Sequence, residues 1–182
     1  EMIDFAKYAF NKSHAAAYAV VSYQTAWLKY YFPVEYMAAL MTSVIDNPSK
    51  VSEYIYACRQ MNIKILPPDI NKGEANFSVD GGDIRYGLAA IKSIGRPVIK
   101  AIVEDREELG LFQNLEDFIT RLSAKNILNK RTIENLIKAG ALDTLGGTRK
   151  QFMSIYVQIV DHVTQEKKNS MVGQMTLFDL VS

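Results

Sequence analysis

The sequence contains few residues that could bind a metal through sulfur or imidazole or form a disulfide. It contains a single cysteine, Cys58, and two histidines, His14 and His162, which lie far apart. One cysteine excludes an internal disulfide framework and a cysteine-rich zinc site, and the spacing of the histidines is not that of a metal site. We expect a reducing, cytoplasmic setting and no bound cofactor in this chain.

The sequence also lacks a long apolar run and a strong excess of charge. Its most apolar stretch, residues 15–41, is interrupted by Gln24, Lys29, Pro33 and Glu35. A membrane span needs roughly 20 consecutive apolar residues, so we expect no insertion in a membrane. The formal net charge is only +1, and any binding of nucleic acid must therefore come from a local arrangement of charge.

A signal peptide is not recognisable at the beginning of the chain. Glu1 precedes Met2, and neither a basic segment nor an apolar segment of the secretory type follows. We expect the chain to be a piece of a longer protein.

What is present is the composition of an ordinary globular protein. Of the 182 residues, 48% are hydrophobic and 23% are charged. Apolar periodicity predicts a mainly α fold, with a long helix over residues 13–31. Further helices are expected over residues 34–45, 49–61, 88–92, 97–109, 114–122, 130–138 and 148–163. Short extended runs on either side of Asp80-Gly81-Gly82-Asp83 predict one small β-hairpin.

Changes in composition and in the apolar pattern along the chain predict three parts. Residues 1–86 form a helical subdomain with the β-hairpin, and residues 87–163 form a second helical domain. Residues 164–182 follow, beginning with the polar run TQEKKNSMVG, which is typical of a flexible linker.

The clearest motif is LAAIKSIGRPVIKAI, residues 88–102, which has the pattern of a helix-hairpin-helix. Gly95 lies in the turn, and Pro97 opens the next helix, where its missing N–H costs nothing. The turn amides and the helix N-terminus can bind a phosphate oxygen without reading a base. Lys92, Arg96 and Lys100 supply positive charge nearby.

A looser copy of the motif spans residues 136–150. Its turn contains Gly140, and the helix that follows carries Arg149 and Lys150. Asp143 weakens this turn as a phosphate site. The alternative for both copies is an ordinary helix connection, because glycine is common just past a helix end.

The long helix begins with a second candidate site, Asn11-Lys12-Ser13-His14. Ser13 is a good N-cap, and a helix N-terminus with Lys12 and His14 beside it suits a phosphate or triphosphate. The alternative is a capped helix with a solvated lysine and a packed histidine.

The third candidate is the tail Gln174-Met175-Thr176-Leu177-Phe178. A glutamine followed by apolar anchors after a flexible linker is typical of a short linear motif that binds a partner. The alternative is a terminal helix or strand that folds back on the core.

Taken together, these blocks resemble a known family. FNKSHAAAYAVVSYQTAWLKYYFPVEYMAALM, ILPPDIN, YGLAAIKSIG, NKRTIENLIKAGALD and GQMTLF occur in the order found in the C-family bacterial replicative polymerases, the DNA polymerase III alpha subunits. The resemblance covers nearly the whole chain. It implies the C-terminal part of the fingers domain, a tandem helix-hairpin-helix domain and an internal clamp-binding motif.

The resemblance also implies roles for individual residues. Asn11, Lys12, Ser13 and His14 match the motif that lines the incoming-nucleotide pocket. Gly95 and Gly140 match the two duplex-binding hairpins, and together with the motif chemistry the residues expected to bind duplex DNA are Lys92, Ser93, Gly95, Arg96, Lys100, Gly140, Arg149 and Lys150. Those implied in binding the sliding clamp are Gln174, Met175, Leu177 and Phe178. Ser93 departs from the pattern, because DNA-binding hairpins usually have glycine there.

By the same resemblance, the parent protein is a DNA-directed DNA polymerase, a nucleotidyltransferase that uses Mg²⁺ held by palm carboxylates. The palm is expected upstream of this chain, so the chain alone is expected to be inactive. The implied partners are duplex DNA, a deoxynucleoside triphosphate, the sliding clamp and other replisome subunits. Two alternatives remain: a non-enzymatic helix-hairpin-helix module of a repair or recombination protein, and a helical scaffold without a nucleic-acid role.

Overall fold

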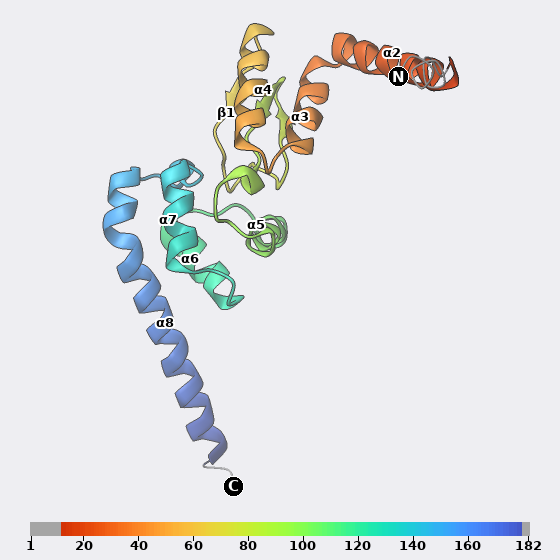
Figure 1. Ribbon diagram of the computed structural model, residues 1–182. Helices are drawn as coiled ribbons and strands as arrows, with labels where there is room; N and C mark the ends of the chain where they lie inside the picture. The colour runs from red at the N-terminus through yellow and green to blue at the C-terminus, as the bar shows by residue number, and fades with distance from the viewer. Residues whose placement is uncertain (1–11, 180–182) are drawn as a thin grey trace, which may run out of the picture.

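The computed structural model describes residues 12–179, and the side chains of residues 12–169. The described chain is mainly helical, as predicted, with one small sheet (Figure 1). The helices are α2 (Lys12–Tyr31), α3 (Pro33–Ser43), α4 (Pro48–Gln60), α5 (Arg96–Leu109), α6 (Leu115–Ala124), α7 (Lys130–Ala139) and α8 (Arg149–Asp179), with 3-10 turns η1 (Leu88–Ala90) and η2 (Asp143–Leu145). None of these helices is long and apolar enough to cross a membrane.

Local signals explain where several helices begin. Proline occupies the first position of α3 and of α4, where its fixed φ suits a helix and no N–H is needed. Three helices begin after an asparagine whose side chain accepts a hydrogen bond from a main-chain N–H three residues on: Asn47 from Lys50 at 3.1 Å, Asn114 from Asp117 at 2.9 Å and Asn129 from Thr132 at 2.9 Å.

The sheet contains the predicted hairpin and one further strand. Strands β2 (Ser78–Asp80) and β3 (Asp83–Arg85) pair antiparallel around Gly81 and Gly82, whose φ values of +62° and +90° suit glycine. Strand β1 (Ile65–Leu66) pairs parallel with β3, giving the order β1-β3-β2. Two residues are too few to show an alternating pattern, so the sequence did not predict β1.

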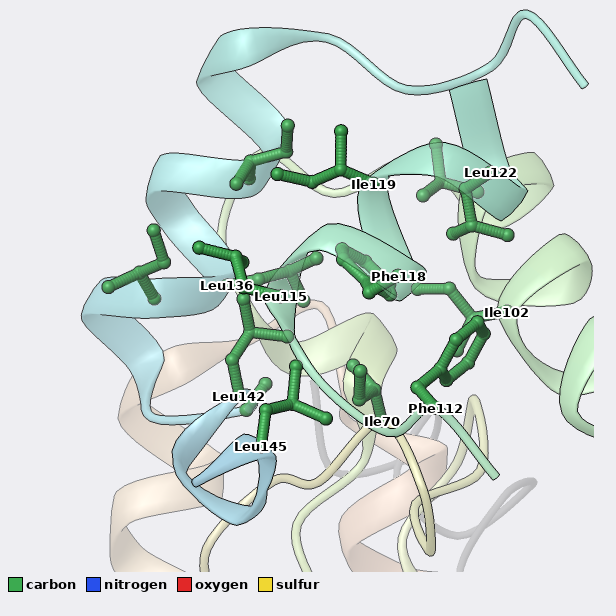
Figure 2. Packing of buried hydrophobic residues seen from close by; sticks show 14 of the residues in the cluster. Ile70, Ile102, Phe112, Leu115, Phe118, Ile119, Leu122, Leu136, Leu142 and Leu145 are labelled. Carbon is green, nitrogen blue, oxygen red and sulfur yellow. The ribbon is translucent and has the colours of Figure 1, made fainter. Parts of the chain in front are cut away.

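The buried apolar residues form two clusters. The smaller packs α3 and α4 against the sheet and includes Met37, Met41, Cys58 and Ile84. The larger joins α5 to α8 through residues such as Ile102, Phe118, Leu136 and Leu142, and it takes in Ile70 from the loop after β1 (Figure 2). Both helix-hairpin-helix candidates contribute to this larger cluster, so they share one core.

Helix α2 has no buried residue and projects away from the rest of the described chain (Figure 1). Its exposed side chains include Tyr23, Trp27 and Tyr30, which are 70%, 43% and 78% accessible. The predicted long helix is therefore confirmed, and its apolar surface is open in the part of the protein described.

Helix α8 corrects the expected flexible linker. The helix predicted to end at residue 163 continues through residues 164–173 and ends at Asp179. The run has no proline and contains helix-favouring Gln165, Glu166 and two lysines. Thr164 donates its hydroxyl to the Val160 carbonyl at 2.7 Å, and Lys167 donates to Asn126 Oδ1 at 2.5 Å. The polar composition predicted a flexible linker, whereas residues with good helix propensity and the contact of Lys167 with the more distant Asn126 accompany a continuous helix.

Candidate nucleic-acid interface

The first hairpin connects η1 to α5 through residues 91–95. Its first element is a single 3-10 turn, shorter than the predicted helix over residues 88–92. Ser93 has φ +65°, whereas Gly95 has φ −73° and ψ 143°, which any residue can adopt. The left-handed position of this turn is therefore Ser93, the position where the resemblance led us to expect glycine.

Gly95 leaves the beginning of α5 open. A Cβ built on Gly95 would meet only Pro97 Cδ at 3.5 Å, an ordinary van der Waals contact. The chain's own packing therefore does not require glycine at this position. The missing side chain instead gives an approaching molecule access to the turn.

The amides of this turn are available to a ligand. Ser93, Gly95 and Arg96 are exposed, and their N–H groups have no acceptor among the described residues. The main-chain bonds of α5 begin with the N–H groups of Val98 and Ile99, which donate to the Gly95 carbonyl at 3.0 and 3.3 Å. Unpaired N–H groups at a helix N-terminus carry partial positive charge and favour an anion.

The three cations of this hairpin differ in their partners. Lys100 lies 3.5 Å from Glu104 Oε1, one turn further along α5. Lys92 and Arg96 are exposed and form no ion pair with any described residue. The net positive charge beside the free amides is therefore that of Lys92 and Arg96.

The second hairpin has a different geometry. Gly140 has φ +81° and ψ 12°, and it ends α7 in the left-handed conformation typical of a helix C-terminus. The N–H groups of Gly140 and Ala141 donate to the carbonyls of Ile137 and Leu136, both at 3.0 Å. Gly140 is also buried, so the expected contact of its amide with a phosphate is not supported.

Arg149 covers the Gly140 turn and is held by Asp143. Its Nε and Nη2 donate to the Asp143 carboxylate at 2.9 and 2.6 Å, and this hydrogen bonding raises the pKa of Arg149. A Cβ on Gly140 would lie 2.1 Å from Arg149 Nη2 and would displace the end of that flexible side chain, whereas the φ of +81° is what favours glycine here. Lys150, in contrast, is exposed and unpaired among the described residues, and it is the open cation of this hairpin.

A hollow of about 360 Å³ separates the two hairpins. Ala90, Ile91 and Lys92 line it from the first hairpin, and Ala139 lines it from the second. Pro68 and Tyr86 complete the lining. The hollow thus lies mainly along the first hairpin, with Lys92 in its lining, and reaches the end of α7 at Ala139.

The other two candidate sites lie apart from the hairpins. Lys12, Ser13 and His14 are exposed at the beginning of α2, which projects away from α5 and α7 (Figure 1). The His14 and Tyr18 rings are in tilted contact, with a centroid distance of 4.4 Å and an interplanar angle of 54°. Asn11 lies outside the described residues, as do the side chains of the four predicted clamp-binding residues.

Sequence reasoning assigned no role to Asp69, Asn71 and Thr144, although ILPPDIN contributed to the resemblance. Their contacts span up to 75 positions of sequence, and no local pattern indicates them. Among the described residues, no group of three or more histidine, cysteine, aspartate or glutamate side chains is arranged to hold a metal ion.

Two helical segments joined by an exposed turn, followed by a second, related pair, define a helix-hairpin-helix protein. Comparison with protein families agrees: the family described as helix-hairpin-helix motif matches residues 62–152, half of the chain. The chain belongs to this family.

Comparison with individual proteins gives relatives named DNA polymerase III subunit alpha. The relative from Mycobacterium tuberculosis is 44% identical over 177 residues, which are 97% of this chain and 15% of the relative. Those from Vibrio cholerae and Escherichia coli K12 are 47% and 46% identical over 179 residues, 98% of this chain and 15% of each relative. The chain thus spans about 15% of the length of the curated relatives it matches.

Proposed function

We propose that this chain is the part of a DNA polymerase III alpha subunit that holds duplex DNA by its sugar-phosphate backbone. The first hairpin receives a phosphate on the amides of Ser93, Gly95 and Arg96. Lys92 and Arg96 supply the positive charge on that hairpin, and Lys150 supplies it on the second.

The exposed, unbonded amides at the beginning of α5 carry this proposal. Such groups recognise a phosphate oxygen, which is the same at every nucleotide, so binding is expected to be independent of base sequence. Each cation at a phosphate releases a counterion, so affinity is expected to fall with added salt.

The experiment measures the affinity of the 182-residue chain for a short duplex at low salt, before and after Gly95→Val. The Cβ of the valine makes only an ordinary van der Waals contact in the fold, and the side chain projects at the open turn, so affinity should fall by about tenfold, as for the loss of about 1.4 kcal/mol. Ala39→Val, on an exposed position of α3, also introduces a valine side chain but away from the hairpins, and it should leave binding unchanged. A folded Gly95→Val chain that binds like the unsubstituted chain would refute the hairpin assignment.

The choice of a polymerase over a repair module rests on the extent of the similarity. Relatives named DNA polymerase III subunit alpha match 97–98% of the chain, which includes the segment of α2 that a duplex-binding module alone does not need. We propose the polymerase activity, with Mg²⁺, for the longer protein in the cytoplasm, and no activity for this chain by itself.

The exposed beginning of α2 supports a further part of the proposal, that Lys12, Ser13 and His14 contact the incoming triphosphate. Lys12→Ala in the longer polymerase should then lower kcat/KM for the nucleotide while DNA binding stays unchanged. Kinetics equal to those of the unsubstituted enzyme would leave Lys12 as a solvated charge.

For the tail, we propose that Gln174, Met175, Leu177 and Phe178 bind the sliding clamp and so help assemble the replisome. The free energy gained by burying two apolar side chains, minus the entropic cost of ordering a short segment, corresponds to micromolar affinity, about −7 to −8 kcal/mol. A peptide of residues 171–180 should bind the clamp, and the same peptide with Leu177→Ala and Phe178→Ala should not. Equal binding by both peptides would remove the motif from the proposal.

A further inference from the structure

One short segment contacts both hairpins. Residues 69–75, here called the clasp, follow β1 and contain the end of the ILPPDIN block. Asp69 and Ile70 are 3% and 0% exposed, so the clasp begins inside the molecule, at the edge of the larger core (Figure 2).

The clasp holds the turn of the second hairpin by two hydrogen bonds. The Ile70 N–H donates to the carbonyl of Ala141, the residue after Gly140, at 3.0 Å. Thr144 donates its hydroxyl to Asp69 Oδ1 at 3.1 Å, and the same oxygen accepts the Asn71 N–H at 2.8 Å. Asp69 therefore links the clasp to the second hairpin and fixes the clasp's own conformation.

The clasp also holds the first hairpin at both of its helical elements. The N–H groups of Leu88 and Ala89 in η1 donate to the Glu74 and Ala75 carbonyls at 2.9 and 3.0 Å. From α5, Arg106 donates to the Ile70 carbonyl at 3.0 Å and to the Gly73 carbonyl at 2.5 Å, and it forms an ion pair with Glu74.

Asn71 fixes the far end of α5. Its side chain donates Nδ2–H to the Phe112 carbonyl and accepts the Phe112 N–H at Oδ1, both at 2.9 Å. This pair reproduces the two-bond pattern of paired strands with a single side chain. The loop between α5 and α6 is thereby tied to the same segment that holds Ala141 and Thr144.

We propose that the clasp sets the relative position of the two hairpins so that both engage one duplex, with Asp69 as its main positioning residue. The apolar core that the hairpins share is not directional, whereas hydrogen bonds to the main chain of both hairpins fix their register. Arg121 of α6 and Lys125 just after it also bind Asp105 of α5, but among the described residues the clasp is the segment that hydrogen-bonds directly to both hairpins. The inference rests on the proposed binding of duplex DNA.

The expected consequence is coupling between the hairpins. When two sites are held at the correct spacing, binding at the first raises the effective concentration at the second. If the spacing is lost, one hairpin at a time binds, and the chain contacts fewer phosphates. Each phosphate lost lowers the slope of log affinity against log salt by about 0.9.

The test compares Asp69→Ala with Asp69→Asn in the full 182-residue chain, on duplex DNA over a range of salt. Asp69→Ala removes the acceptor of Thr144 and Asn71, and affinity at low salt should fall by about tenfold or more, with a smaller salt slope. Asp69→Asn keeps an Oδ1 acceptor and should retain most of the affinity. Adding Lys150→Gln should weaken the unsubstituted chain but have no further effect on Asp69→Ala.

Two further variants keep the test decisive. Asn114→Ala removes an N-cap of α6 without touching the clasp, so it lowers stability but should leave the salt slope unchanged. If Asp69→Ala does not fold, Thr144→Val, which changes an exposed residue and removes one clasp bond, takes its place.

The outcomes separate the inference from the proposed function. The inference would be overturned, with duplex binding left intact, by a folded clasp variant that keeps the duplex affinity and the salt slope of the unsubstituted chain. The same variant would also have to lose as much affinity on Lys150→Gln as the unsubstituted chain does. The proposed function and the inference would both be overturned if the chain does not bind duplex DNA. They would also be overturned if Lys92→Gln, Arg96→Gln and Lys150→Gln leave its affinity unchanged.

Discussion

Ser93 is the residue on which the geometry of the first hairpin depends. It is exposed and has φ +65°. In this left-handed region any residue with a side chain is disfavoured by roughly 1–2 kcal/mol relative to glycine. Serine at this position preserves the turn at a cost in stability, and its side chain stands beside the amides that we assign to phosphate.

Ser93→Gly should therefore stabilise the chain. Relief of the left-handed conformation, less the greater flexibility of glycine in the unfolded chain, raises the free energy of unfolding by about 0.5–1 kcal/mol. Denaturant unfolding measures the change. Ser52→Gly, on an exposed position inside α4, is the control and should be destabilising. A Ser93→Gly chain that loses as much stability as Ser52→Gly would contradict the left-handed assignment.

The two hairpin glycines show what sequence alone predicts about the site. Gly95 and Gly140 carry the same signal in the sequence, yet only Gly140 is in the left-handed region, and Gly95 has ordinary φ and ψ. The sequence predicted the cations but not all of their partners. The pairing of Arg149 with Asp143 depends on how α8 begins, which the local pattern does not determine.

At the scale of elements, the helices were predictable where capping signals are strong. Pro33, Pro48 and three capping asparagines mark the starts of α3, α4, α6 and α7, and Gly81-Gly82 marks the β-hairpin. Strand β1 was not predicted because its two residues are a strand only through their pairing with β3, which lies far along the chain. The length of α8 was wrong because the polar composition of residues 164–173 is compatible with either disorder or an exposed helix.

The β-hairpin is closed by an ion pair that makes its stability depend on pH. Arg85 donates to Asp80 through Nε at 3.0 Å and Nη2 at 2.5 Å, and these hydrogen bonds hold the pKa of Asp80 below its ordinary value of 3.8. Because the pKa is lower in the folded state, the stabilisation is present above the ordinary value and is lost as pH falls through the folded pKa.

The stability of the unsubstituted chain should thus decrease below about pH 4 more steeply than that of Asp80→Asn, which cannot ionise at this position. Urea unfolding at a series of pH values between 2 and 6 compares the two chains. Parallel stability curves would show that Asp80 makes no ionised contact with Arg85.

At the scale of the whole molecule, the described chain has a packed body, from which α2 and the C-terminal part of α8 extend (Figure 1). Two apolar clusters hold the sheet, α3 and α4 on one side and α5 to α8 on the other, while α2 contains no buried residue and extends away from them (Figure 1). The candidate duplex-binding surface belongs to the packed body. It is therefore formed by elements whose relative positions are fixed by shared packing and by the clasp.

The central claim, that this body holds the backbone of duplex DNA through its hairpins, is tested most directly by the salt dependence of duplex affinity. The unsubstituted 182-residue chain should bind duplexes of unrelated sequence equally. Its log affinity should fall linearly with log salt, and the chain with Lys92→Gln and Arg96→Gln should have a slope smaller by about 1.8, corresponding to two phosphates. Equal slopes for the two chains, or affinity that depends on base sequence, would contradict the account.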